Sequence, residues 1–336
     1  MANFWDERRV LVTGGSGFIG SHLVERLVNL GAKVRVIDNL CHGSLSNLDG
    51  CEKDIEILKH DLSDLDSCIN GCRGTNVVLN LAARVSGISF NRTHSGEMFQ
   101  INSRIGMNML EAARLTDVER FLVVSSACVY SAESSVPTPE SEGFMNDPET
   151  TNWGYGWAKR FAEVQAKAYA EQYGMKIGIV RPYNTYGPRD HFSLGEAHVI
   201  PALIKKILDG HDPLEVWGSG EQTRSFIYVD DVVSGMLLGI ARHPYPDPIN
   251  IGSVEEVKIK NLVQIIQDAT GRKQKVEFNT SQPQGQARRK PDVSKAKKLL
   301  GFEASIPIVD GIRKTLDAYE ATIRGNSNIE AMHLSP

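Results

Sequence analysis

A glycine-rich turn directly after an apolar strand is the feature that most constrains how this chain can fold. The run Val10-Leu11-Val12 leads into Thr13-Gly14-Gly15-Ser16-Gly17-Phe18-Ile19-Gly20. Without Cβ atoms at Gly14 and Gly17 the backbone can turn tightly and approach a pyrophosphate, and Gly20 lets the following helix pack close to the strand. Because a helix N-terminus attracts negative charge, the turn predicts a dinucleotide phosphate site made by Gly14, Gly17, Phe18, Ile19 and Gly20.

The segment after the turn also fits a dinucleotide site. Apolar positions recur at helical spacing as far as Leu30, Gly31 ends the helix, and a strand from Lys33 to Ile37 ends in Asp38. Asp38 lies about 20 residues beyond the glycines, where an acid holds a ribose diol. Since a carboxylate there repels a 2′-phosphate, we expect NAD rather than NADP as the cofactor, with Asn39 beside Asp38 in its site.

Strand and helix signals alternate through the first half of the chain. Apolar runs predict strands, and apolar residues at helical spacing predict helices. The expected strands are 55–58, 77–81, 121–125 and 177–180, and the expected helices are 65–72, 98–115 and 158–173. This order predicts an α/β fold of Rossmann type, a doubly wound parallel sheet that binds its ligands at the carboxyl ends of the strands.

The chain changes character beyond Arg181. Proline and glycine become frequent, and helices expected at 199–208, 230–241 and 259–269 are mixed with short strands. We therefore expect an NAD-binding domain over 1–181 and a smaller α/β substrate-binding lobe over 182–325, interleaved with the first. Residues 326–336 are polar and non-periodic, and we expect them to be disordered.

Composition excludes several classes of function. The net charge of −4 leaves no electrostatic footprint for nucleic acid. The start of the sequence lacks the apolar core of a signal peptide, and no apolar run is long enough to span a membrane. The five cysteines have no metal-ligand spacing. We expect a cytoplasmic protein without a metal site and without a nucleic-acid or membrane partner.

A tyrosine and a lysine four residues apart are the first candidates for catalysis. In Tyr155-Gly156-Trp157-Ala158-Lys159 the two side chains share one helix face. A nearby ammonium favours the phenolate and brings tyrosine, whose pKa is about 10, toward the range of a general base. Ser126, at the end of the strand 121–125, could bond the same substrate oxygen, and Lys159 could also hold the cofactor ribose.

Together these motifs resemble the extended short-chain dehydrogenase/reductase family over nearly the whole chain. The resemblance rests on the glycine turn, Asp61-Leu62, Leu81-Ala82-Ala83, Ser126, Tyr155 with Lys159, and the stretches 181–188 and 224–231. It implies NAD contacts from Asp61, Leu62, Leu81, Ala82 and Ala83. It also implies catalysis by Ser126, Tyr155 and Lys159, and a homodimer built from the helices 98–115 and 158–173.

The stretches 181–188 and 224–231 resemble the nucleotide-sugar branch of that family. This resemblance implies a nucleotide-diphosphate sugar as substrate, with Asn184 in contact with it and Arg224 paired with its diphosphate, a role that suits a guanidinium fork. It further implies that Gly87 lies close to the sugar. Arg289, chosen over its neighbour Arg288, and Lys206 are further candidates for the diphosphate.

The residues after Ser126 separate the reactions of this branch. Dehydratases carry an Asp-Glu pair there, whereas this chain has Ala127-Cys128, so a 4,6-dehydratase is disfavoured. Cys128, and His198 within Ala197-His198-Val199-Ile200-Pro201, resemble GDP-mannose 3,5-epimerases and GDP-fucose synthases. Once C4 is a ketone, the hydrogens on C3 and C5 become acidic. A thiol and an imidazole, with pKa values of about 8.5 and about 6.5, are suited to exchange them near neutral pH.

We therefore predict an NAD-dependent nucleotide-sugar epimerase that oxidises C4 transiently and inverts C5, with or without C3, most like a GDP-mannose 3,5-epimerase. A reductase like GDP-fucose synthase, which consumes NADPH, is the first alternative: the context of His198 favours it and Asp38 disfavours it. A plain 4-epimerase and a dinucleotide-sensing protein without turnover are further alternatives. The sequence leaves open the nucleotide base, and which of Cys128 and His198 acts as base.

Overall fold

The computed structural model describes residues 2–85, 87–195, 197–282 and 285–333, and this part of the chain contains a seven-stranded parallel sheet. The strand order is β11-β6-β5-β4-β1-β2-β3. The strands are β1 (Arg9–Thr13), β2 (Lys33–Asp38), β3 (Ile55–Lys59), β4 (Val77–Asn80), β5 (Arg120–Val124), β6 (Lys176–Pro182) and β11 (Ile249–Ile251). The order reverses between β1 and β4, which is where a doubly wound sheet opens a crevice for ligands. The predicted α/β fold is confirmed.

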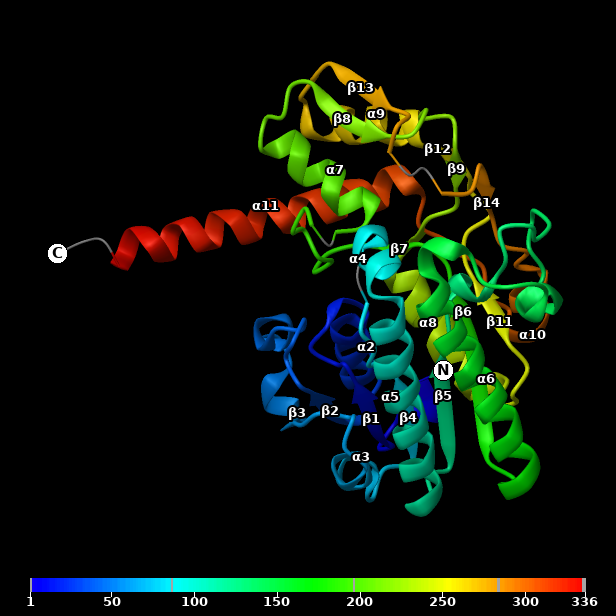
Figure 1. Cartoon of the computed structure of the whole chain (residues 1–336). Helices are drawn as coiled ribbons and strands as arrows, with labels where there is room; N and C mark the ends of the chain where they lie inside the picture. The colour runs from blue at the N-terminus through cyan, green and yellow to red at the C-terminus, as the bar shows by residue number, and fades with distance from the viewer. Residues whose placement is uncertain (1, 86, 196, 283–284, 334–336) are drawn as a thin grey trace.

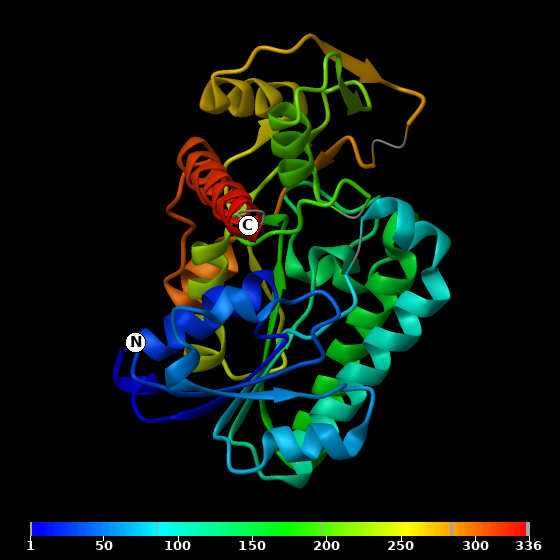
Figure 2. The same cartoon turned by 90° about the vertical axis from the view of Figure 1, so that its left-hand side faces the viewer.

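Helices cover both faces of the sheet (Figures 1 and 2). One face carries α3 (Leu65–Cys72), α5 (Ser95–Leu115) and α6 (Trp153–Tyr173), and the other carries α2 (Phe18–Asn29), α8 (Val229–Arg242) and α10 (Ser294–Leu300). Because both faces are buried, the strands are apolar along their length rather than alternating. In β1, Val10 and Val12 join the core beneath α2 and α8, whereas Leu11 points to the opposite core beneath α5 and α6.

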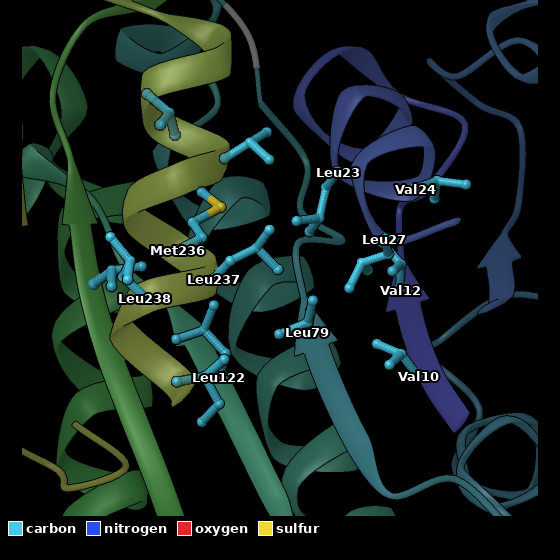
Figure 3. Packing of buried hydrophobic residues seen from close by; sticks show 14 of the residues in the cluster. Val10, Val12, Leu23, Val24, Leu27, Leu79, Leu122, Met236, Leu237 and Leu238 are labelled. Carbon is cyan, nitrogen blue, oxygen red and sulfur yellow. The ribbon is translucent and has the colours of Figure 1, made fainter. Parts of the chain in front are cut away.

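Figure 3 shows the core between α2 and α8. Leu23 and Leu27 of α2 lie in one cluster with Met236 and Leu237 of α8, above the strands β1 and β4. These side chains have no exposed surface. Burying a side chain of this size contributes about 1.5–3 kcal/mol, so this core holds the helix after the glycine turn firmly against the sheet.

The chain crosses from the sheet to the second part and back again. Strand β11 pairs with β6 at the edge of the sheet, and α8 and α10 pack on its face. The unit that contains the sheet therefore includes segments far beyond residue 181. The elements are interleaved because an extra parallel strand needs a long crossover connection to reach the sheet edge.

The smaller lobe lies over the carboxyl ends of the sheet strands (Figure 1). Its core joins α7 (Val199–Leu208), β8 (Leu214–Trp217), α9 (Ile259–Thr270) and the start of α11 (Ile308–His333) in one apolar cluster. Strand β13 (Val276–Asn279) pairs with β8. Short strands complete the lobe and its base: β7 (Thr185–Tyr186), β9 (Thr223–Arg224), β10 (Ile227–Tyr228), β12 (Val257–Lys258) and β14 (Arg288–Arg289).

The short helical elements are α1 (Ala2–Trp5), α4 (Ile88–Thr93) and the 3₁₀ helices Leu45–Leu48, Glu52–Asp54, Ala127–Val129, Glu140–Phe144 and Thr150–Asn152. In the described part of the chain, none of the helices combines the length and the apolar character that crossing a membrane requires.

The last helix is the longest of the described elements. α11 runs as far as His333, and Figure 1 shows it reaching well beyond the lobe. The disorder expected for 326–336 from the polar composition stays a prediction. Residues 334–336 lie outside the described range. Once a helix is nucleated, each further residue adds one backbone hydrogen bond, and no proline interrupts the segment before its last residue.

Candidate active site

A cleft of about 1010 Å³ separates the carboxyl ends of the sheet strands from the smaller lobe. Both parts of the molecule line it, from the glycine turn and the ends of β2 and β5 to the start of α7 and the end of β9. Every residue that the sequence analysis assigned to cofactor, substrate or catalysis lines this cleft. The fold thus brings together candidates that are up to 275 positions apart, from Gly14 to Arg289.

The glycine turn forms one end of the cleft. Gly14 has a φ of +66°, and a Cβ there would lie 3.1 Å from the backbone of Ala82. A Cβ at Gly20 would collide with the carbonyl oxygen of Gly14. Gly17 precedes α2 without a side-chain cap, and the buried Ser16 Oγ has no hydrogen-bond partner among the described residues. The first backbone N–H groups of α2 and the hydroxyl of Ser16 are therefore free to donate hydrogen bonds. Because Gly14 and Gly17 carry no side chains that would block an approach, these donors fit a dinucleotide pyrophosphate.

Hydrogen bonds join the loops after β1, β2 and β4 at the end of the cleft that the glycine turn forms. Thr13 Oγ1 donates to Asn80 Oδ1 at 2.7 Å and accepts from the backbone N–H of Ala82 at 2.9 Å. The Asp38 carboxylate accepts the backbone N–H groups of Ser16 at 3.1 Å and Leu40 at 2.9 Å. Each carboxylate oxygen keeps a further lone pair, so Asp38 can still accept ribose hydroxyls.

Two further cofactor candidates contact each other on the same side of the cleft. Asn39 Nδ2 donates to Asp61 Oδ2 at 3.2 Å, and Asp61 also accepts the backbone N–H of Ser63 at 2.7 Å. These hydrogen bonds lower the pKa of the Asp61 carboxyl, the one from Ser63 most strongly. Asp61 is therefore ionised at neutral pH, an acceptor only, at the edge of the proposed adenosine site.

Ser126, Tyr155 and Lys159 meet where β5 ends. Ser126 caps the 3₁₀ helix Ala127–Val129, its Oγ accepts the backbone N–H of Cys128 at 3.1 Å, and its side chain hydrogen-bonds to Tyr155. Lys159 Nζ lies 5.3 Å from the centre of the Tyr155 ring and donates to the Val124 carbonyl at 2.9 Å. The predicted helical spacing of Tyr155 and Lys159 is confirmed by α6.

Burial controls the protonation of this pair. It raises the pKa of the Tyr155 phenol, opposite to the shift that the sequence predicts from Lys159, and the hydrogen bond with Ser126 only partly offsets it. Burial also lowers the pKa of Lys159 to about 8. Burial therefore disfavours the charged form of each residue on its own. The Tyr155 phenolate and the Lys159 ammonium are most stable when both are present, because each offsets the other's charge.

Cys128 lies beside a buried arginine. Arg289 hydrogen-bonds to the Cys128 side chain and pairs with Glu149 at 3.5 Å. Burial by itself lowers the pKa of Arg289, but Cys128 and Glu149 outweigh it, so the net shift is upward. Arg289 is consequently a fixed cation next to the thiol. Its neighbour Arg288 points away and pairs with Glu256 at 2.6 Å.

Arg224 brings a second guanidinium close to the first. Its Nη1 donates to the carbonyls of Thr223 at 2.8 Å and Gln286 at 2.7 Å. Burial, followed by the charge of Arg289, lowers the pKa of Arg224 to about 10. Two cations near one carboxylate, Glu149, leave an excess of positive charge in this part of the cleft, which suits an anion such as a diphosphate.

Two substrate candidates are also held by backbone carbonyls. Asn184 Nδ2 donates to Ser225 O at 2.8 Å, and Lys206 Nζ donates to Glu215 O at 3.1 Å. Gly87 lines the cleft directly before α4. All three border the cleft, and Lys206 lies on α7 two turns beyond His198.

His198 stands at the start of α7, with its side chain 53% exposed in the cleft. Its Nδ1 lies 3.7 Å from Oδ1 of Asp190, which is almost completely buried. Enclosure in the cleft lowers the pKa of His198, but its contact with Asp190 more than compensates, and the net shift is upward. The imidazole is thus poised beside a carboxylate at the end of the cleft that belongs to the lobe.

Sequence reasoning missed three residues of this site: Thr13, Glu149 and Asp190. Thr13 follows directly on the apolar run of β1, so its position at a strand end could have indicated it. Asp190 lies eight residues before His198 and ends a turn with proline and glycine. Glu149 lies in an irregular stretch before α6, where no periodicity marks it.

Comparison with known proteins gives a consistent result. The NAD dependent epimerase/dehydratase family matches residues 10–252. Over 95% of its length the chain is 31% identical to a dTDP-4-dehydro-6-deoxy-D-allose reductase of a Streptomyces species, covering 98% of that protein. It is also 31% identical, over 93% of its length, to GDP-mannose 3,5-epimerase 1 of Oryza sativa subsp. japonica, covering 82% of that protein.

Solved structures agree with this result. The fold matches that of UDP-glucose 4-epimerase from Thermotoga maritima, solved with UDP-glucose, with a TM-score of 0.86 and 28% identity, covering 94% of this chain and 99% of the other. It also matches a complex of UDP-glucose 4-epimerase from Thermus thermophilus with NAD, with a TM-score of 0.78 and 28% identity over 93% of this chain and 99% of the other.

The cleft joins the glycine turn to a serine, a tyrosine and a lysine, residue types that suit proton transfer at a substrate hydroxyl. The chain belongs to the NAD dependent epimerase/dehydratase family, and NAD is its cofactor.

Proposed function

We propose that the protein is a redox-neutral nucleotide-sugar epimerase that oxidises C4 transiently and then inverts C5, with or without C3, most like a GDP-mannose 3,5-epimerase. The observation that carries this proposal is that Cys128 and His198 line the same cleft as Ser126, Tyr155 and Lys159. A plain 4-epimerase does not need a second acid–base pair, since its keto-sugar only rotates before hydride returns.

The residues at the end of β5 carry out the first step, the oxidation of C4. In its phenolate form, which the ammonium of Lys159 stabilises, Tyr155 accepts the proton of the C4 hydroxyl while Ser126 holds the same oxygen. The glycine turn and Asp38 would hold NAD, which would supply the acceptor and donor of the C4 hydride. Arg224 and Arg289 hold the diphosphate, which fixes the sugar ring over Ser126.

Cys128 and His198 carry out the second step, the inversion at C5 or C3. The charged residues next to them support an assignment of which is the base and which is the acid. The guanidinium of Arg289 lies next to the side chain of Cys128, and we assign Cys128 as the base that removes the proton from the carbon next to the C4 ketone. Asp190 next to His198 stabilises the imidazolium, so His198 delivers a proton to the opposite face. One proton leaves and one arrives, and the configuration is inverted.

Deuterium exchange tests this proposal directly. The purified protein is incubated with GDP-mannose in D2O without added cofactor, and the sugar is followed by NMR. Deuterium at C5 or C3, together with new isomers, is the expected result. If no exchange occurs, the reaction or the substrate is wrong, and 4-keto-6-deoxy sugars with NADPH are tried next.

Two variants separate the steps. We expect Cys128→Ser and His198→Gln to lose deuterium exchange but to keep oxidation at C4, seen as a transient absorbance of reduced cofactor. Cys51→Ser and His211→Gln change the same residue types outside the residues that line the cleft and are expected to behave like the wild type. Full exchange in both active-site variants would mean that Cys128 and His198 are not the acid–base pair. Inversion at C4 without any deuterium at C3 or C5 in the wild type would favour a 4-epimerase.

A second candidate is an epimerase or reductase that consumes NADPH. The 31% identity to a dTDP-4-dehydro-6-deoxy-D-allose reductase over nearly the full length favours a reductase. The carboxylate of Asp38 at the end of β2 disfavours NADPH. Stoichiometric loss of NADPH in the presence of a 4-keto sugar would support this candidate over the first.

We also infer a cytoplasmic homodimer built from α5 and α6. Apolar side chains are exposed along both helices: Phe99, Met107, Leu115, Trp153, Phe161, Val164 and Tyr173. Such a patch on two neighbouring helices suits an interface between identical copies. Val164→Glu is expected to convert the dimer to a monomer in sedimentation experiments, and an unchanged mass would contradict this interface.

A further inference from the structure

The connection from β7 to α7 holds a buried carboxylate against the candidate acid–base histidine. The Asp190 side chain is 3% exposed, and its Oδ1 accepts the backbone N–H of His191 at 2.8 Å. The same oxygen lies 3.7 Å from His198 Nδ1, while Oδ2 has no hydrogen-bond partner among the described residues. A buried carboxylate with one unused oxygen is costly unless a cation pairs with it.

The turn that carries Asp190 is fixed to the body of the molecule. Arg189, with a φ of +66°, pairs with Glu25 of α2 at 2.5 Å, and His22 of the same helix contacts the Pro188 carbonyl at 3.0 Å. On the other side, Phe192 stacks on Tyr319 of α11 at 3.8 Å. Asp190 is therefore held in place independently of His198, as a residue that orients another must be.

We propose that Asp190 is the positioning residue for His198: its carboxylate accepts the Nδ1–H so that Nε2 faces the sugar across the cleft from Cys128. This inference rests on the proposed function, because it assigns His198 a proton to deliver. The distance of 3.7 Å is that of an ion pair, and such contacts often shorten when substrate closes a site. A carboxylate on Nδ1 also selects the tautomer and stabilises the charged ring.

Other charged groups around this end of the cleft are already paired or lie farther along it. Arg189 is paired with Glu25, and Lys206 donates to the carbonyl of Glu215. His191, next to Asp190, also lines the cleft. Asp190 is the group that acts on the charge of His198, and it raises the pKa of the imidazole.

An NMR titration tests the contact without any substrate. The imidazole signals of the purified protein are followed against pH, with His198 assigned from the loss of its signal in His198→Gln. We expect the pKa of His198 to fall in Asp190→Asn, which keeps the acceptor for His191, and to return toward the wild-type value in Asp190→Glu. Asp247→Asn, which removes the carboxylate 3.2 Å from His243, should leave His198 unchanged. An unchanged His198 pKa in Asp190→Asn would overturn the proposal.

The same variants are then assayed for deuterium exchange with GDP-mannose. Asp190→Asn should slow exchange about 10- to 100-fold. This loss is smaller than the loss expected from removing the acid–base group itself, because His198 is still present. Because His198 acts as its charged form, the pH above which exchange falls should move to lower pH, with KM little changed. Normal exchange in Asp190→Asn would refute the positioning role. If the wild type itself does not exchange, the proposed function has failed, and the titration alone decides whether Asp190 controls His198.

Discussion

The two sides of the cleft are built in different ways. On the side of the sheet, backbone atoms and short side chains from strand ends make the contacts, as with Gly14 against Ala82 and Thr13 against Asn80. On the side of the lobe, long charged side chains make the contacts, as with Arg224 and Arg289. A site made of backbone is sensitive to added volume, whereas a site made of long side chains is sensitive to lost charge. Substitutions on the two sides should therefore fail for different reasons.

The largest effect is expected where the two sides meet. Tyr155→Phe removes one oxygen atom and leaves α6 intact, so turnover should fall by about 10²–10⁴-fold, the range of general acid–base catalysis. Unfolding by urea should change little. Full turnover in this variant would mean that Tyr155 is not the base. If the wild type shows no turnover, and Tyr155→Phe binds its ligands as the wild type does, the protein is a dinucleotide sensor.

Loss of charge is tested on the side of the lobe with two arginines. Arg224→Gln should raise KM for the sugar nucleotide about 10- to 150-fold, because a hydrogen bond to a charged group contributes about 1.5–3 kcal/mol. Arg288→Gln, which breaks only the pair with Glu256 at the surface, should change KM less than about fivefold. Equal effects of the two variants would show that the positive charge of the cleft does not select the substrate.

Added volume is tested on the side of the sheet with two glycines. A Cβ at Gly20 would meet the carbonyl of Gly14, so Gly20→Ala should lower the free energy of unfolding by about 1–3 kcal/mol and weaken NAD binding. Gly96 is also helical, and no atom of a neighbouring residue lies within 4 Å of the place that a Cβ would take there. Gly96→Ala should leave stability unchanged or raise it by about 0.5 kcal/mol. An unchanged free energy of unfolding in Gly20→Ala would contradict the close packing of α2 on the turn.

The smallest effect concerns the buried ammonium. The folded-state pKa of Lys159 is lowered to about 8, while an unfolded lysine titrates near about 10.4. Between these values the unfolded chain binds more protons, so this group makes the free energy of unfolding rise with pH from about 8 to about 10. Urea unfolding at both pH values should show this rise in the wild type. Lys159→Met should lose it, whereas Lys298→Met, a change of an exposed lysine on α10, should keep it. The same slope in all three proteins would mean that Lys159 is not titrating in this window.

Much of the fold could be predicted because local patterns and burial coincide in the sheet. Strands covered on both faces are continuous apolar runs, so β1, β4 and β5 are recognisable from sequence alone. The glycine turn could be predicted for a similar reason: a backbone that approaches its ligand leaves no choice of residue at Gly14 and Gly20. The disorder expected at the end of the chain stays a prediction, because polar composition near a terminus does not by itself exclude a helix that continues from a packed one.

The sequence by itself determined the class of fold, the cofactor crevice and the serine, tyrosine and lysine at the end of β5, because these depend on spacing within single elements or between consecutive ones. Only the tertiary structure decided which charges meet: Arg289 with Cys128 and Glu149, and Asp190 with His198. Those side chains lie in loops, at a helix start or in elements of two or three residues, which are too short for a periodic pattern to mark them. Their partners are set by how the lobe closes over the sheet, which depends on the packing of the whole chain.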